Sequence, residues 1–158
     1  MGLRPAGLAD LGFLTEMLYQ SIFVPPGEPP PARTILDEPR IAHCLHEWGR
    51  IGDFALVAEC GERLAGAAWL RFMPSDHPGF GYVAEDVPEI GIALEPWARG
   101  QVVGTRLLAG LGAHARSAGI RALSLSVDPR NPAPRLYQRL GWTKVGAVDG
   151  NWTMLKHL

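Results

Sequence analysis

Apolar residues recur at helical spacing in two long stretches of the chain. Within residues 8–19, four leucines lie three or four positions apart, and a similar series begins at Val103 and stops near Gly119. This spacing gathers the apolar side chains on one face of an α-helix. The sequence therefore predicts two long amphipathic helices, each with one face suited to packing on a sheet.

Two shorter patterns predict two further helices. Over residues 38–48 the spacing places Ile41, Leu45 and Trp48 on one side. Residues 134–140 begin with a proline, which suits the first turn of a helix because the missing N–H has no partner there.

Runs of apolar and β-branched residues between turn signals predict strands. The tetrapeptide 60–63 separates two such runs by the length of a hairpin turn, so this pair is expected to be antiparallel. The predicted strands cover residues 3–6, 54–59, 64–71, 89–94, 123–127, 143–145 and 152–156.

Two segments have neither the helical spacing of apolar residues nor the pattern of a strand. Residues 24–33 contain too many prolines for a helix or strand, and residues 74–88 hold prolines and glycines without apolar periodicity. Both are expected to be loops. Loops of this length often carry function, but a simple spacer explains residues 24–33 equally well.

The order of these elements predicts the fold class. Hairpin strands in the first half and alternating strands and helices in the second half are typical of an α/β fold with a mixed sheet covered by helices. In such folds a strand that leads through a turn into a helix is a common ligand site. Residues 89–119 have this arrangement.

Composition limits the function classes. With 158 residues and 47% hydrophobic content, the chain can bury one core, so one domain over residues 1–158 is expected. A net charge of −1 argues against a general nucleic-acid binder. No stretch has the ~20 apolar residues of a membrane span. Cys44 and Cys60 form no Cys-x-x-Cys pair and no metal site is expected, so a cytoplasmic protein is the prediction.

The turn after residues 89–94 has the features of an anion site. Its sequence, ARGQVVGTRLL from Ala98 to Leu108, combines glycines with the start of a helix. A helix N-terminus offers free N–H groups and partial positive charge, and Arg99 and Arg106 add formal charge. A phosphate group is the expected guest, and an ordinary strand-to-helix turn is the alternative.

A second motif lies further along, with the sequence NPAPRLYQRLGW from Asn131 to Trp142. Together with the glycine turn, it resembles the GNAT family of N-acetyltransferases over residues 89–158. The resemblance implies a single-domain α/β fold with a mixed, mostly antiparallel sheet, a splayed parallel strand pair and helices on both faces. It also implies an acetyl-CoA-binding core over residues 89–142.

By this resemblance the turn wraps the pyrophosphate of acetyl-CoA. Val102 occupies the first glycine position of the family motif and Gly104 the second, which is a departure at Val102. The backbone of the preceding strand would pair with the pantetheine arm. The implied cofactor-binding residues are Ile92, Ala93, Leu94, Arg99, Gly100, Gln101, Val102, Val103, Gly104, Thr105, Asn131 and Tyr137.

The second motif carries two implied roles. Asn131 would contact the pantetheine arm or position the following helix, and Tyr137 would direct its hydroxyl toward the thioester sulfur. A thiolate leaving group, with a reference pKa near ~8.5 for its thiol, benefits from such a proton donor. The alternative is that Tyr137 is only a core residue of a short helix.

Acetyl transfer to an amine also needs a base. An amine with a pKa of ~10.4 is neutral in only about one molecule in two thousand at pH 7. Glu89, at the start of its strand, resembles the glutamate that some family members use, and a surface charge is the equal alternative. Glu85, Asp86 and His77, in the preceding loop, are candidate substrate contacts.

The sequence thus predicts an acetyl-CoA-dependent N-acetyltransferase that acts directly on a primary amine of a small molecule or protein. Cys44 and Cys60 lack a neighbouring base, so a cysteine nucleophile is not expected. A non-catalytic acyl-CoA-binding module and a transferase for longer acyl chains are the alternatives. The resemblance also allows a homodimer, and neither a nucleic-acid nor a membrane partner is expected.

Overall fold

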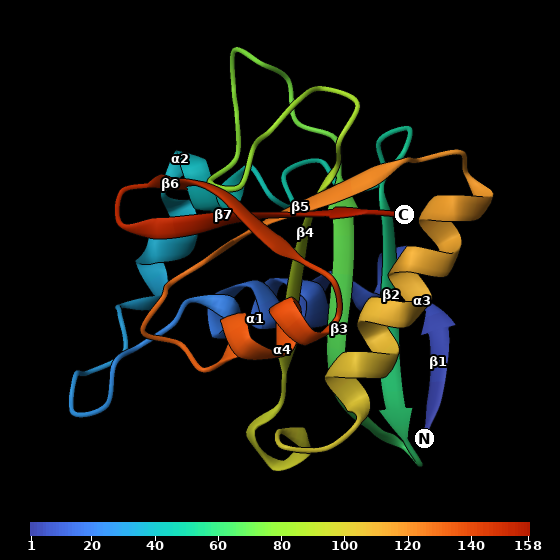
Figure 1. Cartoon of the computed structure of the whole chain (residues 1–158). Helices are drawn as coiled ribbons and strands as arrows, with labels where there is room; N and C mark the ends of the chain where they lie inside the picture. Colours follow the sequence, from blue (N-terminus) through green and yellow to red (C-terminus); the bar gives the residue numbers. More distant parts are fainter.

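The computed structural model describes residues 1–158, and its seven strands form one sheet in the order β1-β2-β3-β4-β5-β7-β6 (Figure 1). The strands are β1 (Gly2–Pro5), β2 (Phe54–Cys60), β3 (Arg63–Arg71), β4 (Glu89–Leu94), β5 (Ala122–Val127), β6 (Thr143–Val148) and β7 (Asn151–His157). The helices are α1 (Leu11–Ser21), α2 (Pro39–Ala42), α3 (Val103–Ser117) and α4 (Ala133–Arg139). Short 3-10 helices cover Leu8–Asp10, Arg33–Asp37 and Pro96–Ala98.

One pair of central strands is parallel and barely joined. β4 and β5 share a single bridge, between Glu89 and Ser124, whereas every other neighbouring pair is antiparallel with a longer ladder. Beyond that bridge the two strands separate. The predicted mixed sheet with a splayed parallel pair is therefore confirmed, and the separation opens the middle of the sheet.

Helices cover both faces of the sheet, and each face has its own core. α3 and α4 lie on one face, where Leu107, Leu111 and Tyr137 pack on β5 (Figure 1). α1 and the segment after α2 lie on the other face, where Leu14 and Met17 pack near Trp69. Because side chains alternate along a strand, β4 directs Ile90 into the first core and Ala93 into the second.

The helix predicted over residues 38–48 is shorter than expected. α2 ends at Ala42, and Glu47 has a φ of 50°, outside the helical region. The carbonyls of His43 and His46 accept hydrogen bonds from the Arg71 guanidinium, at 2.9 and 2.7 Å. Arg71 of β3 thus binds carbonyls that would accept intrahelical hydrogen bonds in a longer helix. Leu45 is nevertheless buried on the predicted side.

The other predicted elements are present, with shifts of a few residues at their ends. Residues 8–10 form a 3-10 turn before α1, and the last two strands are longer than predicted. Residues 24–32 and 74–88 contain no helix or strand, as expected. No helix combines the length and apolar character that crossing a bilayer requires.

Candidate active site

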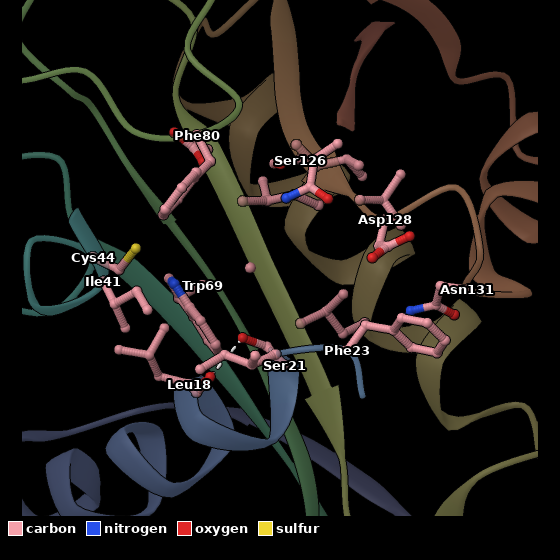
Figure 2. A pocket seen from close by; sticks show the side chains of 18 of the residues that line it. Leu18, Ser21, Phe23, Ile41, Cys44, Trp69, Phe80, Ser126, Asp128 and Asn131 are labelled. Carbon is pink, nitrogen blue, oxygen red and sulfur yellow. Dashed lines mark hydrogen bonds between the residues drawn. The ribbon is translucent and has the colours of Figure 1, made fainter. Parts of the chain in front are cut away.

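The opening between β4 and β5 holds a cavity of about 280 Å³ (Figure 2). Its wall includes residues of α1 and α2 from one face of the sheet and Tyr137 of α4 from the other. The cavity therefore passes through the sheet where the two strands separate. Its lining residues are Leu18, Ser21, Ile22, Phe23, Ile41, Cys44, Trp69, Arg71, Met73, Phe80, Glu89, Ile90, Gly91, Ile92, Leu125, Ser126, Val127, Asp128, Asn131, Tyr137 and Asn151.

Glu89, the predicted base, lies in this wall. Its Oε1 accepts a hydrogen bond from the Gly81 N–H at 2.9 Å, and its Oε2 is buried without a protein partner. Burial raises the pKa of Glu89 to about 7, and the Gly81 N–H and the charge of Arg40 only partly oppose this. A carboxyl that changes protonation near neutral pH suits general base catalysis.

The segment Gly79–Phe80–Gly81 forms a roof over Glu89. A Cβ atom at Gly79 would lie 1.9 Å from Glu89 Oε2, and one at Gly81 would lie 2.5 Å from the carbonyl carbon of Leu125 in β5. Only glycine permits these approaches. The close contact explains both the N–H partner of Glu89 and the burial of its carboxyl.

Arg40 of α2 holds this roof in place through a cation–π contact. Its guanidinium carbon lies 4.0 Å from the centre of the Phe80 ring, and its Nη1 donates to Asp149 Oδ2 at 2.8 Å. Asp149 belongs to the turn between β6 and β7. One side chain thus joins α2, the roof and the β6–β7 turn.

Arg71 of β3 also reaches the wall, but its charge is neutralised. Its Nε and Nη2 donate to both carboxylate oxygens of Asp53, at 3.0 and 2.7 Å, and its Nη1 donates to the two histidine carbonyls described above. The two side chains are only 2% and 3% exposed. Arg71 therefore has a structural partner set that occupies four of its five N–H groups, and Asp53 balances its charge.

Tyr137 enters the cavity from the opposite face. Its ring is buried, with the Trp142 ring tilted against it at 6.1 Å between centroids. Burial raises the pKa of the Tyr137 hydroxyl to about 12. The hydroxyl is therefore protonated at neutral pH and available as a donor to a group bound in the cavity.

Asn131 lies at the same end of the cavity as Asp128 and Phe23 (Figure 2). Its Oδ1 accepts a hydrogen bond from the Ala133 N–H at 2.9 Å, at the start of α4. The side chain thus orients the helix that carries Tyr137. Asp128 is bound by Arg130, which lowers the pKa of its carboxyl.

The backbone of β4 presents free groups toward the opening. The Glu95 N–H donates to the Ala65 carbonyl of β3, which sets the phase of the antiparallel ladder. With Ala67 opposite Ala93 in that ladder, the backbone groups of Ala93 face β3, and those of Ile92 and Leu94 face β5. Of the three predicted backbone contacts, Ile92 and Leu94 have the orientation to bind an extended ligand.

The glycine turn needs no glycine at the position of Val102. Val102 has a φ of −73°, so its β-branched side chain is unstrained, and it is 66% exposed. The positive φ of the turn falls on Gly100, at 70°, with no atom within 4 Å of where a Cβ would stand. A Cβ at Gly104 would lie 3.5 Å from Leu94 Cδ1, which is ordinary contact distance.

The start of α3 has no side-chain cap. The N–H groups of its first turn, at Val103, Gly104 and Thr105, are therefore oriented for an anion. Arg99 folds back, with its Nε 3.1 Å from the Leu94 carbonyl oxygen and its Nη2 3.3 Å from Gln20 Oε1. Gln101 bonds the Trp97 carbonyl, so neither side chain points into the turn.

The three predicted substrate contacts lie outside the cavity wall. Glu85 accepts a hydrogen bond from the Ser75 N–H, and both Glu85 and Asp86 are exposed. His77 is exposed beside Asp76, with its ring centre 6.0 Å from that of His43. A contact between these residues and a substrate stays a prediction.

Several lining residues were not among the predicted site residues. Cys44, Trp69 and Phe80 carry no motif, and they reach the cavity only because α2, β3 and the roof converge there. Asp128 directly follows the strand Ala122–Val127, and a polar residue at that position is a recognisable signal in α/β folds. The pair of glycines around Phe80 is a second signal, for close backbone approach.

Comparison with known proteins gives a consistent picture. The sequence matches the model of the acetyltransferase (GNAT) family over residues 16–142. No curated protein matches the sequence. The match covers both motifs and most of the cavity wall.

Solved structures with similar folds include the following three, which are 17–21% identical to this chain. The GNAT domain of PAT from S. lividans has a TM-score of 0.71 at 20% identity, covering 99% of this chain and 89% of that one. A ribosomal-protein-alanine N-acetyltransferase from Brucella melitensis has a TM-score of 0.71 at 21% identity, covering 100% of both chains. The PaiA N-acetyltransferase from Thermoplasma acidophilum, solved with coenzyme A, has a TM-score of 0.69 at 17% identity and covers 100% of both.

Proposed function

The chain belongs to the acetyltransferase (GNAT) family, and from this premise we propose that it transfers the acetyl group of acetyl-CoA directly to a primary amine. One observation carries the proposal. Glu89, with a pKa of about 7, and Tyr137, with a protonated hydroxyl, line the same cavity from different elements. A base for the incoming amine and a donor for the leaving group are the two functions that this reaction needs.

The residues of the opening fit acetyl-CoA, which supplies a thioester-activated acetyl group. The uncapped N-terminus of α3 and the turn at Gly100 would hold the pyrophosphate. The backbone groups of Ile92 and the Leu94 N–H, which face the opening, would bind the pantetheine arm, since the Leu94 carbonyl already accepts from Arg99. We take residues 89–142 as the acetyl-CoA-binding core within one domain over residues 1–158.

In the proposed reaction Glu89 removes a proton from the bound ammonium, directly or through a water. The neutral nitrogen then forms a bond to the thioester carbonyl carbon as the C–S bond breaks. The Ile92 N–H donates to the oxygen on which negative charge develops, and Tyr137 donates toward the departing sulfur. The acetylated nitrogen loses its surplus proton to solvent, solvent reprotonates Tyr137, and Glu89 releases the proton that it took. The products are the N-acetyl amine and free coenzyme A thiol.

Direct transfer is preferred over a covalent acetyl-enzyme. Cys44 is the one cysteine in the cavity wall, and burial raises the pKa of its thiol to about 12. A thiol is a nucleophile only as its thiolate, so Cys44 is inert near neutral pH. Holding both reactants in one cavity provides the alternative source of rate.

The test is release of free thiol from acetyl-CoA with a panel of primary amines. We expect Glu89→Gln to lower kcat/KM by about 10²–10⁴ and Tyr137→Phe to lower kcat about tenfold or more. Glu62→Gln, at an exposed position of the β2–β3 turn, is the matched control. Calorimetry should show that both site variants still bind coenzyme A.

Failure has two recognisable forms. A folded protein that binds coenzyme A and acetylates no amine would be the non-catalytic binding module. Faster turnover with a longer acyl-CoA would make it a transferase for that chain.

The cytoplasm is the compartment proposed for the reaction, since both cysteines are free thiols.

A further inference from the structure

The part of the cavity between Glu89 and α1 and α2 is apolar. Leu18, Ile41, Trp69 and Phe80 form its wall, and Ile22 also lines the cavity; Phe23 lies at the other end, beside Asn131 and Asp128 (Figure 2). Glu89 projects to this face because it is four positions before Ala93 on β4, so the two side chains share a face, and Ala93 belongs to the core beneath α1. On the proposed function, the pantetheine arm uses the opening between β4 and β5, so this apolar part receives the acceptor.

The charges of the wall are almost all neutralised within the protein. Three Asp, Glu, Lys or Arg residues line the cavity, namely Arg71, Glu89 and Asp128. Arg71 is paired with Asp53, and Asp128 is paired with Arg130. Only Glu89 has no ionic partner. Arg40, the nearest charge behind the wall, is paired with Asp149 and covers the outer Phe80 ring.

This charge pattern restricts the acceptor. One carboxyl can receive one ammonium, but a second ammonium on the same molecule would lie against apolar side chains. A carboxylate on the acceptor would find no unpaired cation, since Asp53 balances the charge of Arg71 and four of the five Arg71 N–H groups are bonded within the protein. Burying an unpaired charge costs several kcal/mol, so both kinds of molecule are disfavoured.

The apolar wall is held in place rather than loosely formed. Arg40 packs on the ring of Phe80, and the Gly81 N–H next to it is hydrogen-bonded to Glu89. The proline-rich loop that follows Phe23 is fastened at its far end, where the Tyr19 hydroxyl donates to the Pro31 carbonyl at 2.7 Å and Arg33 pairs with Glu16. Anchored aromatic side chains give selectivity for shape as well as for polarity.

We propose that the acceptor is a small monoamine whose primary amino group is attached to an aromatic or branched aliphatic group, with no carboxylate and no second ammonium. This rests on the proposed function and adds its substrate class. The amino group lies at Glu89, and the apolar group packs against Ile41, Trp69 and Phe80, with its far end directed toward Phe23.

Matched pairs of amines test the substrate class. Phenethylamine and phenylalanine differ by one carboxylate, and butylamine and putrescine differ by one ammonium. We expect kcat/KM to favour the first member of each pair by about 100-fold or more, because the second buries an unpaired charge. A peptide with a free N-terminal alanine should also be a poor acceptor.

A substitution that adds charge to the wall gives a second test. Phe23→Asp should lower kcat/KM for phenethylamine and reduce the preference for butylamine over putrescine about tenfold. Phe23→Leu should keep that preference, and Val145→Asp, at an exposed position on β6, should leave it unchanged. Thermal unfolding of each variant checks that it is folded.

The outcomes separate the two proposals. If thiol release is fastest with putrescine, phenylalanine or the peptide, the substrate class is wrong and the acetyltransferase proposal stands. If no amine gives thiol release, the proposed function fails. Binding provides a readout without turnover, since phenethylamine alone should raise the Tm of the wild type and not of Phe23→Asp.

Discussion

Arg71 and Glu89 lie directly opposite each other in the β3–β4 ladder, yet no ion pair joins them. The guanidinium of Arg71 turns away to Asp53 and to two backbone carbonyls, and the carboxyl of Glu89 turns to the Gly81 N–H. An arginine paired directly with Glu89 would hold its pKa low and make it a poor base. The separation of the two charges therefore preserves the raised pKa of Glu89.

Asp53→Asn should reveal this relationship. The substitution leaves the buried Arg71 charge without its counter-ion, which should lower the free energy of unfolding by about 3 kcal/mol. The uncompensated charge should also lower the pKa of Glu89 and move the acidic limb of kcat/KM to lower pH. Urea unfolding and a pH–rate profile measure the two effects.

Asp10→Asn is the control for Asp53→Asn. It removes the partner of Arg4 in another arginine–aspartate pair, far from the cavity in β1 and the turn before α1. It should cost some stability and leave the pH profile unchanged. An unchanged profile for Asp53→Asn as well would show that Arg71 has no influence on Glu89.

The pH dependence of wild-type activity should report Glu89. The charged or titratable groups near its carboxyl are Arg71 from β3, Arg40 from α2 and the Cys44 thiol. Only the ionised carboxylate acts as a base, so kcat/KM should rise about tenfold per pH unit below pH 7 and level off above it. In Glu89→Gln this limb should disappear; its persistence would assign the base to another group.

The free energy of unfolding should fall as pH rises, whereas kcat/KM rises. The pKa of Glu89 is about 7 in the folded protein and 4.5 in its ordinary state, so between these values the folded protein holds more protons. The contribution of Glu89 is thus fully present below pH 4.5 and is lost as pH rises through 7. At pH 8 Glu89→Gln should therefore have a higher free energy of unfolding than the wild type, by up to about 3 kcal/mol. Urea unfolding should show this as a higher midpoint concentration. Equal stability at pH 8 would mean that the wild-type carboxyl ionises without penalty.

The sequence predicted most of the fold because each core face has a clear local pattern. The strand over residues 89–94 and the helix from Val103 match the structure at the residues that matter for the site. The error over residues 38–48 arose from a long-range contact. Helical spacing says nothing of an arginine on β3 that binds carbonyls of that segment.

In the site, too, the sequence predicted the residues that belong to local motifs and missed those that depend on long-range contacts. Glu89, Asn131 and Tyr137 belong to motifs with fixed spacing, and the structure brings all three to one cavity. Phe80 reaches it through the fold of a loop with no periodicity, and Arg40 acts on it from a helix far along the chain. Local patterns cannot describe such contacts, because the chain alone does not say which loop covers which strand.

Gly81→Ala should separate the roof from β5. The added Cβ would lie 2.5 Å from backbone atoms of Leu125, so the loop must move and Glu89 loses its N–H partner. We expect a loss of about 2 kcal/mol in stability and a lower midpoint in the pH–rate profile, because opening the roof relieves the burial that raises the pKa of Glu89, an effect larger than that of the lost N–H. Gly12→Ala in α1 makes the same chemical change in open space, and it should stabilise by up to about 1 kcal/mol. A Gly81→Ala protein with wild-type pH behaviour would remove the role given to the roof in burying Glu89.

The two ends of the glycine turn should respond differently to substitution. Val102→Gly should change the Kd of coenzyme A less than twofold, because the φ of Val102 is already negative. Gly100→Val should weaken binding about tenfold, since a β-branched residue is strained at a φ of 70°. Titration calorimetry measures both, and a large gain from Val102→Gly would show that the departure at this position impairs the turn.

The cavity that passes through the sheet also has a kinetic consequence. On the proposed function, the thioester arrives along the separated strands, while the amine arrives beneath the roof, so neither reactant blocks the entrance of the other. Both can be present before either bond changes, and each product can leave by its own route. Double-reciprocal plots of initial rate should therefore intersect at a point rather than run parallel, as they would for an enzyme that must release coenzyme A before it can admit the amine.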